Sequence, residues 1–284
     1  MAQHVRAIKS RIGNIENIRQ ITKAMNAIAM TKLTRIKRRL AGVRPYVDGL
    51  ERFVADLLGR AGDTTQPHPL TVSDNAPGVG ILVLNADRGL CGRFKGEVNA
   101  GAERLLEEVG VEARLLIGGE KARTHFDRHS VEPLRIYTHV YEEPTAEIAR
   151  RIAADLISLC TEGVLGRVVV VYMRFLSDLI QRLTVEEILP LAVEPRAGDA
   201  IIEPDLTTVL NAALPAFLEG RVYRLLLETK TSEHAIRRQA MKNATENADD
   251  LLTTLTRAYN RARQQSITRE IADIMGGAEA LREG

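Results

Sequence analysis

The residues best suited to chemistry form a short segment at positions 87–92, which reads Asp-Arg-Gly-Leu-Cys-Gly. It follows an apolar stretch and precedes an amphipathic one, so its glycines could let backbone amides cradle a phosphate at the start of a helix. The dinucleotide-binding fingerprint, however, needs three glycines at fixed offsets, and no P-loop lysine pattern follows. We therefore interpret the segment as a tight strand-to-helix turn in which Asp87 and Arg88 make local contacts. A nucleotide-dependent α/β enzyme stays open as an alternative.

Other reactive side chains form no recognisable catalytic group. The histidines around positions 125–139 lack the usual metal-ligand spacing, the serines sit in no nucleophile-elbow context, and the paired glutamates are interpreted as solvent-facing. These residues are His125, His129 and His139; Ser73, Ser130 and Ser177; and Glu142, Glu143, Glu186 and Glu187. We expect no catalytic residue, no cofactor and no metal site.

Charge is distributed unevenly, although the formal net charge is only +2. Residues 1–44 contain many lysines and arginines and a single acid, Glu16. Such a segment should seek nucleic acid, anionic lipid or carboxylate-rich protein loops, or else form a solvated basic face. The segment has no aromatic residue for base stacking, and its cations wind around a helix, which disfavours nucleic acid. A coiled-coil scaffold or nucleic-acid binder remains a second alternative.

Composition limits the class of protein. The 284 residues are 45% hydrophobic, 27% charged and only 4% aromatic, which suits aliphatic helix seams in a globular protein. Cys91 and Cys160 form no metal spacing and no disulfide framework, so a reducing compartment is expected. Apolar runs stay short of the roughly 18 residues that cross a bilayer. The basic N-terminus could suggest a presequence, but its pattern continues into a longer helix.

Both ends of the chain predict long helices with heptad seams. The C-terminal seam is predicted at Met241, Ala244, Ala248, Leu251, Leu255, Ala258 and Ala262, with a jump of five to Ile267 followed by Ile271 and Ile274. The N-terminal seam is predicted at Ile18, Ile21, Met25 and Ile28, with a jump of five to Leu33 and then Ile36, Leu40, Val43, Val47, Leu50, Val54 and Leu57. Pro45 is expected to kink the first helix, and Pro215 and Gly220 to kink or break the second near its start.

Between these helices, strands and helices alternate, which predicts a mostly parallel sheet covered by helices. Strands are expected near 79–84, 113–117, 134–137, 168–175 and 181–189, and helices near 94–109, 120–126 and 145–160. Helices of roughly 85 and 105 Å cannot wrap within a body of about 150 residues, so an antiparallel coiled coil is expected to project from it. The predicted domains are an N-terminal helix (1–58), a linker (59–78), an α/β foot (79–204) of Rossmann-like type and a C-terminal helix (205–284), with Asp205 as its N-cap.

Several segments resemble the gamma-subunit family of rotary, F-type ATP synthases. They are Ile21–Met25, Arg44–Tyr46, Asp87–Gly92, Ser232–His234, Ala240–Thr245, Tyr259–Gln264 and Ser266–Thr268, and they occur in the family's order. Residues 110–200 match only in general layout. The resemblance implies a non-catalytic central rotor stalk that couples ion-driven rotation of a c-subunit ring to ATP synthesis or hydrolysis in beta subunits.

The resemblance also implies partners and contact residues. The coiled coil would enter a ring of three alpha and three beta subunits, while the foot would meet the epsilon subunit and the c-ring, peripheral to the cytoplasmic face of a bacterial plasma membrane and without nucleic acid. The residues that match beta-subunit contacts are Lys23, Met25, Arg237, Arg263, Gln264 and Thr268, and Glu203 matches the residue facing the c-ring.

Overall fold

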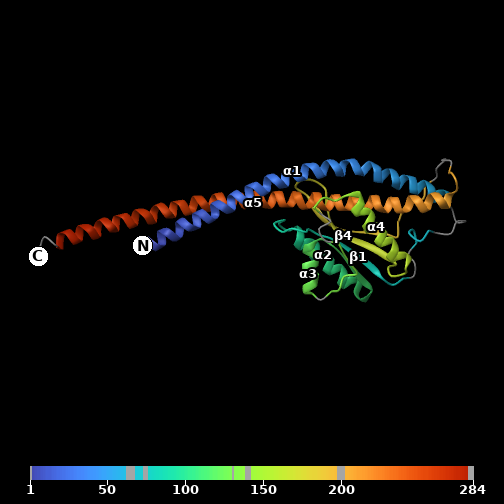
Figure 1. Ribbon diagram of the computed structural model, residues 1–284, viewed down its shortest axis with the longest axis horizontal. Helices are drawn as coiled ribbons and strands as arrows, with labels where there is room; N and C mark the ends of the chain where they lie inside the picture. Colours follow the sequence, from blue (N-terminus) through green and yellow to red (C-terminus); the bar gives the residue numbers. More distant parts are fainter. Residues whose placement is uncertain are drawn as a thin grey trace. The chain divides into compact units, whose positions relative to one another are not determined.

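The first and last elements of the chain are two long helices (Figure 1). The structure is a computed structural model that describes residues 2–61, 68–72, 76–129, 131–137, 142–196 and 202–280. Helix α1 spans Ala2–Ala61 and helix α5 spans Leu206–Ala280, so at 1.5 Å per residue they are roughly 90 and 110 Å long. Asp205 caps α5 as predicted, because its carboxylate accepts hydrogen bonds from the backbone amide and the hydroxyl of Thr208.

Neither proline ends its helix. Helix α1 continues through Pro45, and α5 continues through Pro215 and Gly220, so the expected break near the start of α5 is wrong. Gly220 instead lies where α1 comes close: a Cβ there would stand 3.3 Å from the Val47 side chain and 3.6 Å from that of Leu50. Packing against α1 thus explains a glycine that reads as a helix breaker in the sequence.

The central sheet has the order β3-β2-β1-β4-β5. Its strands are β1 (Val79–Leu84), β2 (Ala113–Gly118), β3 (Arg135–Tyr137), β4 (Arg167–Phe175) and β5 (Gln181–Leu189). The first four are parallel, and β5 returns antiparallel beside β4. A mostly parallel sheet between helices was predicted and is confirmed. Strand β1 is buried on both faces, as its continuous apolar sequence requires.

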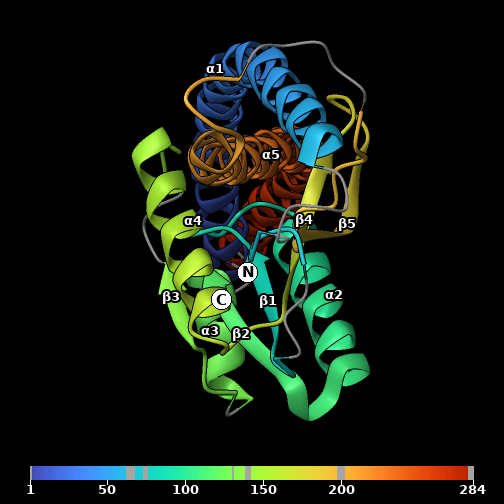
Figure 2. The ribbon, with the colours of Figure 1, turned by 90° about the vertical axis from the view of Figure 1, so that its right-hand side faces the viewer.

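Helices cover the two faces of this sheet. On one face α2 (Phe94–Val109) and α3 (Glu120–Arg128) share a core with alternate residues of β1, among them Ile81 and Val83. On the other face α4 (Ala146–Thr161), α5 and α1 share a core with Leu82 and Leu84. Figure 2 shows α4 and α2 on opposite sides of β1. The alternation of strand side chains therefore divides the core into two parts.

The chain separates into two compact units. The helical unit comprises Met1–Ile28 and Arg238–Gly284, and the sheet unit comprises Ala29–Arg237. The division falls inside both long helices, which run side by side within each unit (Figure 1). The domain limits expected from the sequence, at residues 58, 78 and 204, remain a prediction.

Candidate functional site

The seam of the helical unit is more regular than the sequence predicted. On α1 the covered positions are Val5, Ile8, Ile12, Ile15, Arg19, Thr22, Met25 and Asn26, and on α5 they are Met241, Ala244, Thr245, Ala248, Leu252, Leu255, Tyr259, Ala262 and Ser266. Both series keep heptad spacing without the jumps of five, so the predicted jumps are wrong. The predicted seam was wrong because several true seam positions hold polar residues, so a search for apolar residues at heptad spacing selected neighbouring positions instead.

Two polar contacts establish the register of the helices in this unit. The Arg19 guanidinium pairs with the Asp249 carboxylate, and the Thr245 hydroxyl lies 2.8 Å from that of Thr22. The higher residue number on α1 pairs with the lower residue number on α5, so the helices are antiparallel, as predicted. At this register Ala2 lies level with about residue 265 of α5. The last turns of α5 therefore extend past the end of α1 (Figure 1).

Because the seam lies elsewhere, an aliphatic stripe is left on the outside of α1. Ile18, Ile21 and Ile28 are 49%, 58% and 57% exposed, and half-buried Met25 lies between them at helical spacing. The extension of α5 has a second exposed stripe, Ile267, Ile271 and Ile274, with Met275 beside it. Contiguous exposed apolar surface of this kind marks an interaction site. The spacing is visible in the sequence, where it predicts the internal seam instead of an exposed stripe.

The five contact residues predicted in the helical unit fall at two levels. Exposed Lys23 and half-buried Met25 lie level with about residues 242–244 of α5, whereas Arg263, Gln264 and Thr268 lie roughly 30–40 Å further along it. These last three are exposed, as predicted for solvent-side positions. Gln264 and Thr268 share one polar face of α5 with Arg261, Gln265 and Arg269. The structure therefore brings the predicted residues together as two bands rather than one cluster.

Arg237 differs from these residues because it is buried within the sheet unit. Its guanidinium lies 2.6 Å from the Glu233 carboxylate and donates hydrogen bonds to the backbone carbonyls of Arg88 and Gly89. Lys230 completes the cluster with a 2.9 Å contact to Glu233. Arg237 thus joins α5 to the turn at residues 87–92, and its guanidinium is engaged within this chain.

Burial shapes the ionisation of this cluster. Burial alone opposes ionisation of Glu233, but the neighbouring Lys230 and Arg237 outweigh it and lower the pKa of the carboxyl group. Burial lowers the pKa of His234 to about 3, against the opposing attraction of Glu233. His234 is therefore neutral at neutral pH, with Nδ1 facing the Arg237 guanidinium at 3.4 Å. Neighbouring Thr229, Thr231 and Ser232 are also buried, so α5 is enclosed on all sides here.

The turn at 87–92 is held by groups of this chain, as the interpretation of a structural turn predicted. The Asp87 carboxylate accepts a hydrogen bond from the backbone amide of Glu120, and Cys91 is buried in the core. Leu90 and Gly92 both have positive φ, of 58° and 53°, which explains a glycine at the second position. Arg237 occupies the carbonyl side of the turn, so these contacts do not support the nucleotide-enzyme alternative.

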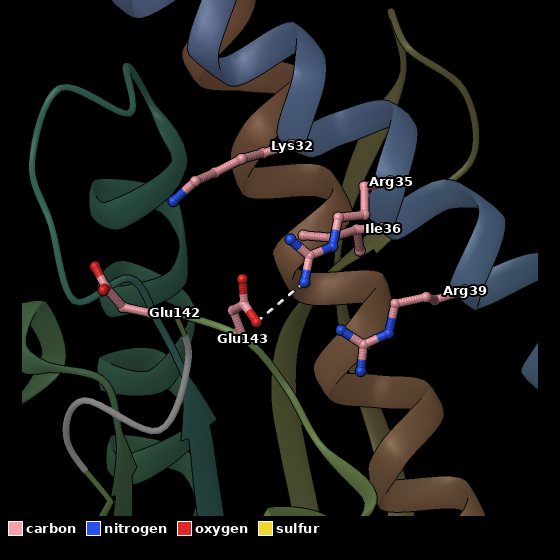
Figure 3. A pocket seen from close by; sticks show the side chains of 6 residues that line it. All are labelled: Lys32, Arg35, Ile36, Arg39, Glu142 and Glu143. Carbon is pink, nitrogen blue, oxygen red and sulfur yellow. Dashed lines mark hydrogen bonds and ion pairs between the residues drawn. The ribbon is translucent and has the colours of Figure 1, made fainter.

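The basic face of α1 meets acidic groups within its own unit. Arg35 lies 3.1 Å from Glu143 in a small pocket that Lys32, Ile36, Arg39 and Glu142 also line (Figure 3). Lys37 pairs with Asp178, and Arg44 lies 3.5 Å from buried Glu228. Several basic side chains of this helix thus pair with carboxylates of the same chain, which weakens the case for binding to nucleic acid.

The remaining sequence candidates lie apart from these surfaces. Glu203 is exposed beside a pocket of about 140 Å³ that Phe53, Ile202 and Val209 help to line. Glu186 is not solvent-facing as expected, because the Tyr172 hydroxyl and Arg221 bind its carboxylate. Ser177 accepts hydrogen bonds from backbone amides in the turn before β5. Outside the described residues lie Ser73, Ser130 and His139.

Among the described residues, every helix is too short or too polar to span a membrane. The two long helices in particular carry charges throughout their length.

Comparison with known proteins agrees with this architecture. A family model described as ATP synthase matches residues 4–281. The ATP synthase gamma chain of Moorella thermoacetica is 38% identical over 98% of this chain and 99% of its own length, and that of Parafrankia sp. is 37% identical over the full length of both.

Solved structures share the fold at lower identity. A chain of the Euglena gracilis mitochondrial ATP synthase, in a structure described as OSCP/F1/c-ring in rotational state 3, aligns with a TM-score of 0.72 and 20% identity, covering all of this chain and 96% of its own. A chain from the central stalk and c-ring of the Tetrahymena thermophila mitochondrial ATP synthase aligns with a TM-score of 0.63 over 79% of this chain and 99% of its own. The chain described here belongs to the ATP synthase gamma chain family.

Proposed function

We propose that this chain is the central rotor stalk of a membrane-bound ATP synthase and is itself non-catalytic. It couples ion-driven rotation of a c-subunit ring to conformational change, and hence to ATP synthesis or hydrolysis, in beta subunits. Membership of the gamma chain family supports this role. The observation that carries the mechanism is the aliphatic stripe of Ile18, Ile21 and Ile28, which stays exposed although the helix seam is complete.

The stripe could form an apolar contact surface, here called the bearing, between the helical unit and the subunits that surround it. Helix pairing already satisfies the internal seam, so the exposed isoleucines can be covered only by another protein surface. A ring of three alpha and three beta subunits around the helical unit would supply that cover. The exposed α5 extension, with Ile267, Ile271 and Ile274 on one stripe, would lie deepest in the same ring.

Torque requires that the three beta subunits meet unequal surfaces. The helical unit provides this asymmetry, because its cross-section presents an aliphatic stripe of α1 on one side and polar faces elsewhere. A partner's conformation shifts only by the difference in contact energy between its states. We propose that Lys23 and Met25 form one band of beta-subunit contacts and that Arg263, Gln264 and Thr268 form another. Arg237 is omitted from this proposal because its guanidinium is engaged by Glu233.

The sheet unit would form the foot. We propose that Glu203, exposed before the start of α5, faces the c-ring and that the foot also binds the epsilon subunit. The assembly would lie peripherally on the cytoplasmic face of a bacterial plasma membrane. The ion pairs of Arg35, Lys37 and Arg44 within the sheet unit would stiffen the base of α1.

Reconstitution with alpha and beta subunits tests the proposal. The variant Ile18→Ser with Ile21→Ser removes two half-exposed aliphatic side chains. Completing the burial of each contributes about half of the usual 1.5–3 kcal/mol, so binding to the ring should weaken roughly 10- to 100-fold. The matched control, Val111→Ser with Leu179→Ser, removes exposed aliphatic residues from the sheet unit and should bind like the wild type.

Two results would contradict the proposal at different levels. Equal affinity of the stripe variant and the control would remove the stripe from the bearing. Failure of the wild-type chain to co-purify with alpha and beta subunits would count against the rotor role itself.

A further inference from the structure

A cluster of three potential ligands lies on the α2/α3 face of the sheet unit, away from every surface discussed above. His125 lies in the last turn of α3, His129 follows four residues later as the C-cap residue of that helix, and Glu103 projects from α2. The Glu103 Oε1 atom lies 2.8 Å from His125 Nε2 and 3.7 Å from His129 Nε2, and the three ligand atoms all lie within 4.8 Å of one another. The expectation of no metal-ligand spacing overlooked that His125 and His129 stand four residues apart, and the third member, Glu103, comes from another helix.

These separations suit a tetrahedral metal ion. With metal–ligand bonds of about 2.0–2.1 Å, the ligand atoms of a tetrahedral site stand about 3.3 Å apart. The two measured separations from Glu103 lie on either side of that value, so small side-chain rotations would bring both imidazoles and the carboxylate to one centre. The two histidines stand four residues apart at the C-terminal end of α3, and both rings face Glu103, so they can share one metal ion.

Local contacts orient the two imidazole rings. His129 Nδ1 lies 2.9 Å from the backbone carbonyl oxygen of His125, which can accept a hydrogen bond only from a protonated Nδ1. In the neutral imidazole with this tautomer, Nε2 of His129 carries the lone pair, and it lies on the side of Glu103. The His125 ring packs edge-on against Phe126, with ring centroids 5.1 Å apart, and Phe126 is buried in the core. Both rings are thus oriented before any ion arrives.

We propose that Glu103, His125 and His129 bind a divalent ion of the Zn²⁺ class, with water in the remaining position. Two imidazoles and one carboxylate favour zinc and its neighbours over magnesium or calcium, which prefer all-oxygen sites. The bound ion joins α2 to α3 across the outer face of the sheet. This site is independent of the rotor role, since none of its residues belongs to the proposed contact bands.

Titration of the untagged full-length chain with zinc chloride, followed by calorimetry, tests the site. The wild type should bind one strongly held ion per chain. The variant His125→Ala with His129→Ala should lose that binding, and Glu103→Gln, which keeps size and hydrogen bonding, should weaken it at least tenfold. The control Asp127→Asn removes an exposed carboxylate from the same helix, outside the cluster, and should bind zinc like the wild type.

A second readout reports coordination rather than affinity. Cobalt(II) added in place of zinc should give the intense visible absorption of a tetrahedral ion in the wild type, and that absorption should vanish in the histidine double variant. Circular dichroism at the same concentrations checks that each variant is folded. Absence of zinc binding to the wild type would overturn the proposal, as would unchanged stoichiometry and affinity in the folded double variant or in Glu103→Gln. The Glu103–His125 contact would then be an ordinary hydrogen bond.

Discussion

The buried histidine of α5 makes the stability of the sheet unit sensitive to mild acid. Burial lowers the pKa of His234 to about 3 in the folded state, whereas an unfolded chain has a histidine pKa of about 6.5. Between these values the unfolded state binds more protons than the folded state. Stability from this group is therefore complete above about pH 6.5 and falls as the pH drops toward 3.

The size of the effect follows from the two pKa values. At pH 5 an unfolded His234 is almost fully protonated and a folded one is almost fully neutral, so the loss relative to pH 7 is about 2 kcal/mol. The variant His234→Gln keeps a side chain of similar length that does not titrate. It should lack this loss, although other groups of the chain continue to contribute their own pH dependence.

Hydrogen exchange followed by mass spectrometry measures this locally. Peptides covering residues 225–237 report the opening free energy of α5 at pH 7 and pH 5, after correction for the intrinsic exchange rate. The pH-dependent loss should be about 2 kcal/mol greater in the wild type than in His234→Gln. The variant His4→Gln, which changes an exposed histidine of the helical unit, should behave like the wild type. Equal pH dependence in the wild type and His234→Gln would refute the reasoning.

Three further outcomes follow from the same structure. Glu233→Ala leaves the buried cations of its cluster without their carboxylate, so urea unfolding should show a loss of about 3–5 kcal/mol, and a loss below 1 kcal/mol would contradict the buried-pair argument. Gly119→Ala places a Cβ 2.2 Å from the Asn85 carbonyl oxygen at a φ of +98°, so the melting temperature should fall by more than it does in the control Gly96→Ala, where the space is open. Arg263→Ala with Gln264→Ala should lower coupled ATP turnover of the reconstituted complex while assembly stays intact; unchanged turnover would remove these residues from the contact band.

Local sequence patterns were sufficient for the secondary structure and for much of the fold. The strand at 79–84 and the helix at 94–109 were predicted at the bounds that the structure has. The strand is an uninterrupted apolar run, and the helix repeats its apolar residues with a period of 3.6, so each pattern lies within its own segment. The cap at Asp205 was equally local. The turn at 87–92 could be interpreted correctly because its glycines fail the known phosphate-binding spacings.

Which residues of the long helices are exposed could not be predicted from one segment, because exposure depends on how the two helices pack. Ile18 and Ile21 read as seam residues, yet Arg19 and Thr22 occupy the seam because their partners, Asp249 and Thr245, satisfy them across the helix pair. A buried position is thus defined by what lies opposite, and that partner is more than 200 residues away in the chain.

The sequence by itself determined the long helices, the alternating α/β block and the family, since each rests on local periodicity or on ordered motifs. Only the tertiary structure decided that Arg237 is held by Glu233 and that Glu103 meets His125. The physical reason is that charge pairing and ligand geometry depend on distances between elements. Those distances are set when the helices pack on the sheet and on one another.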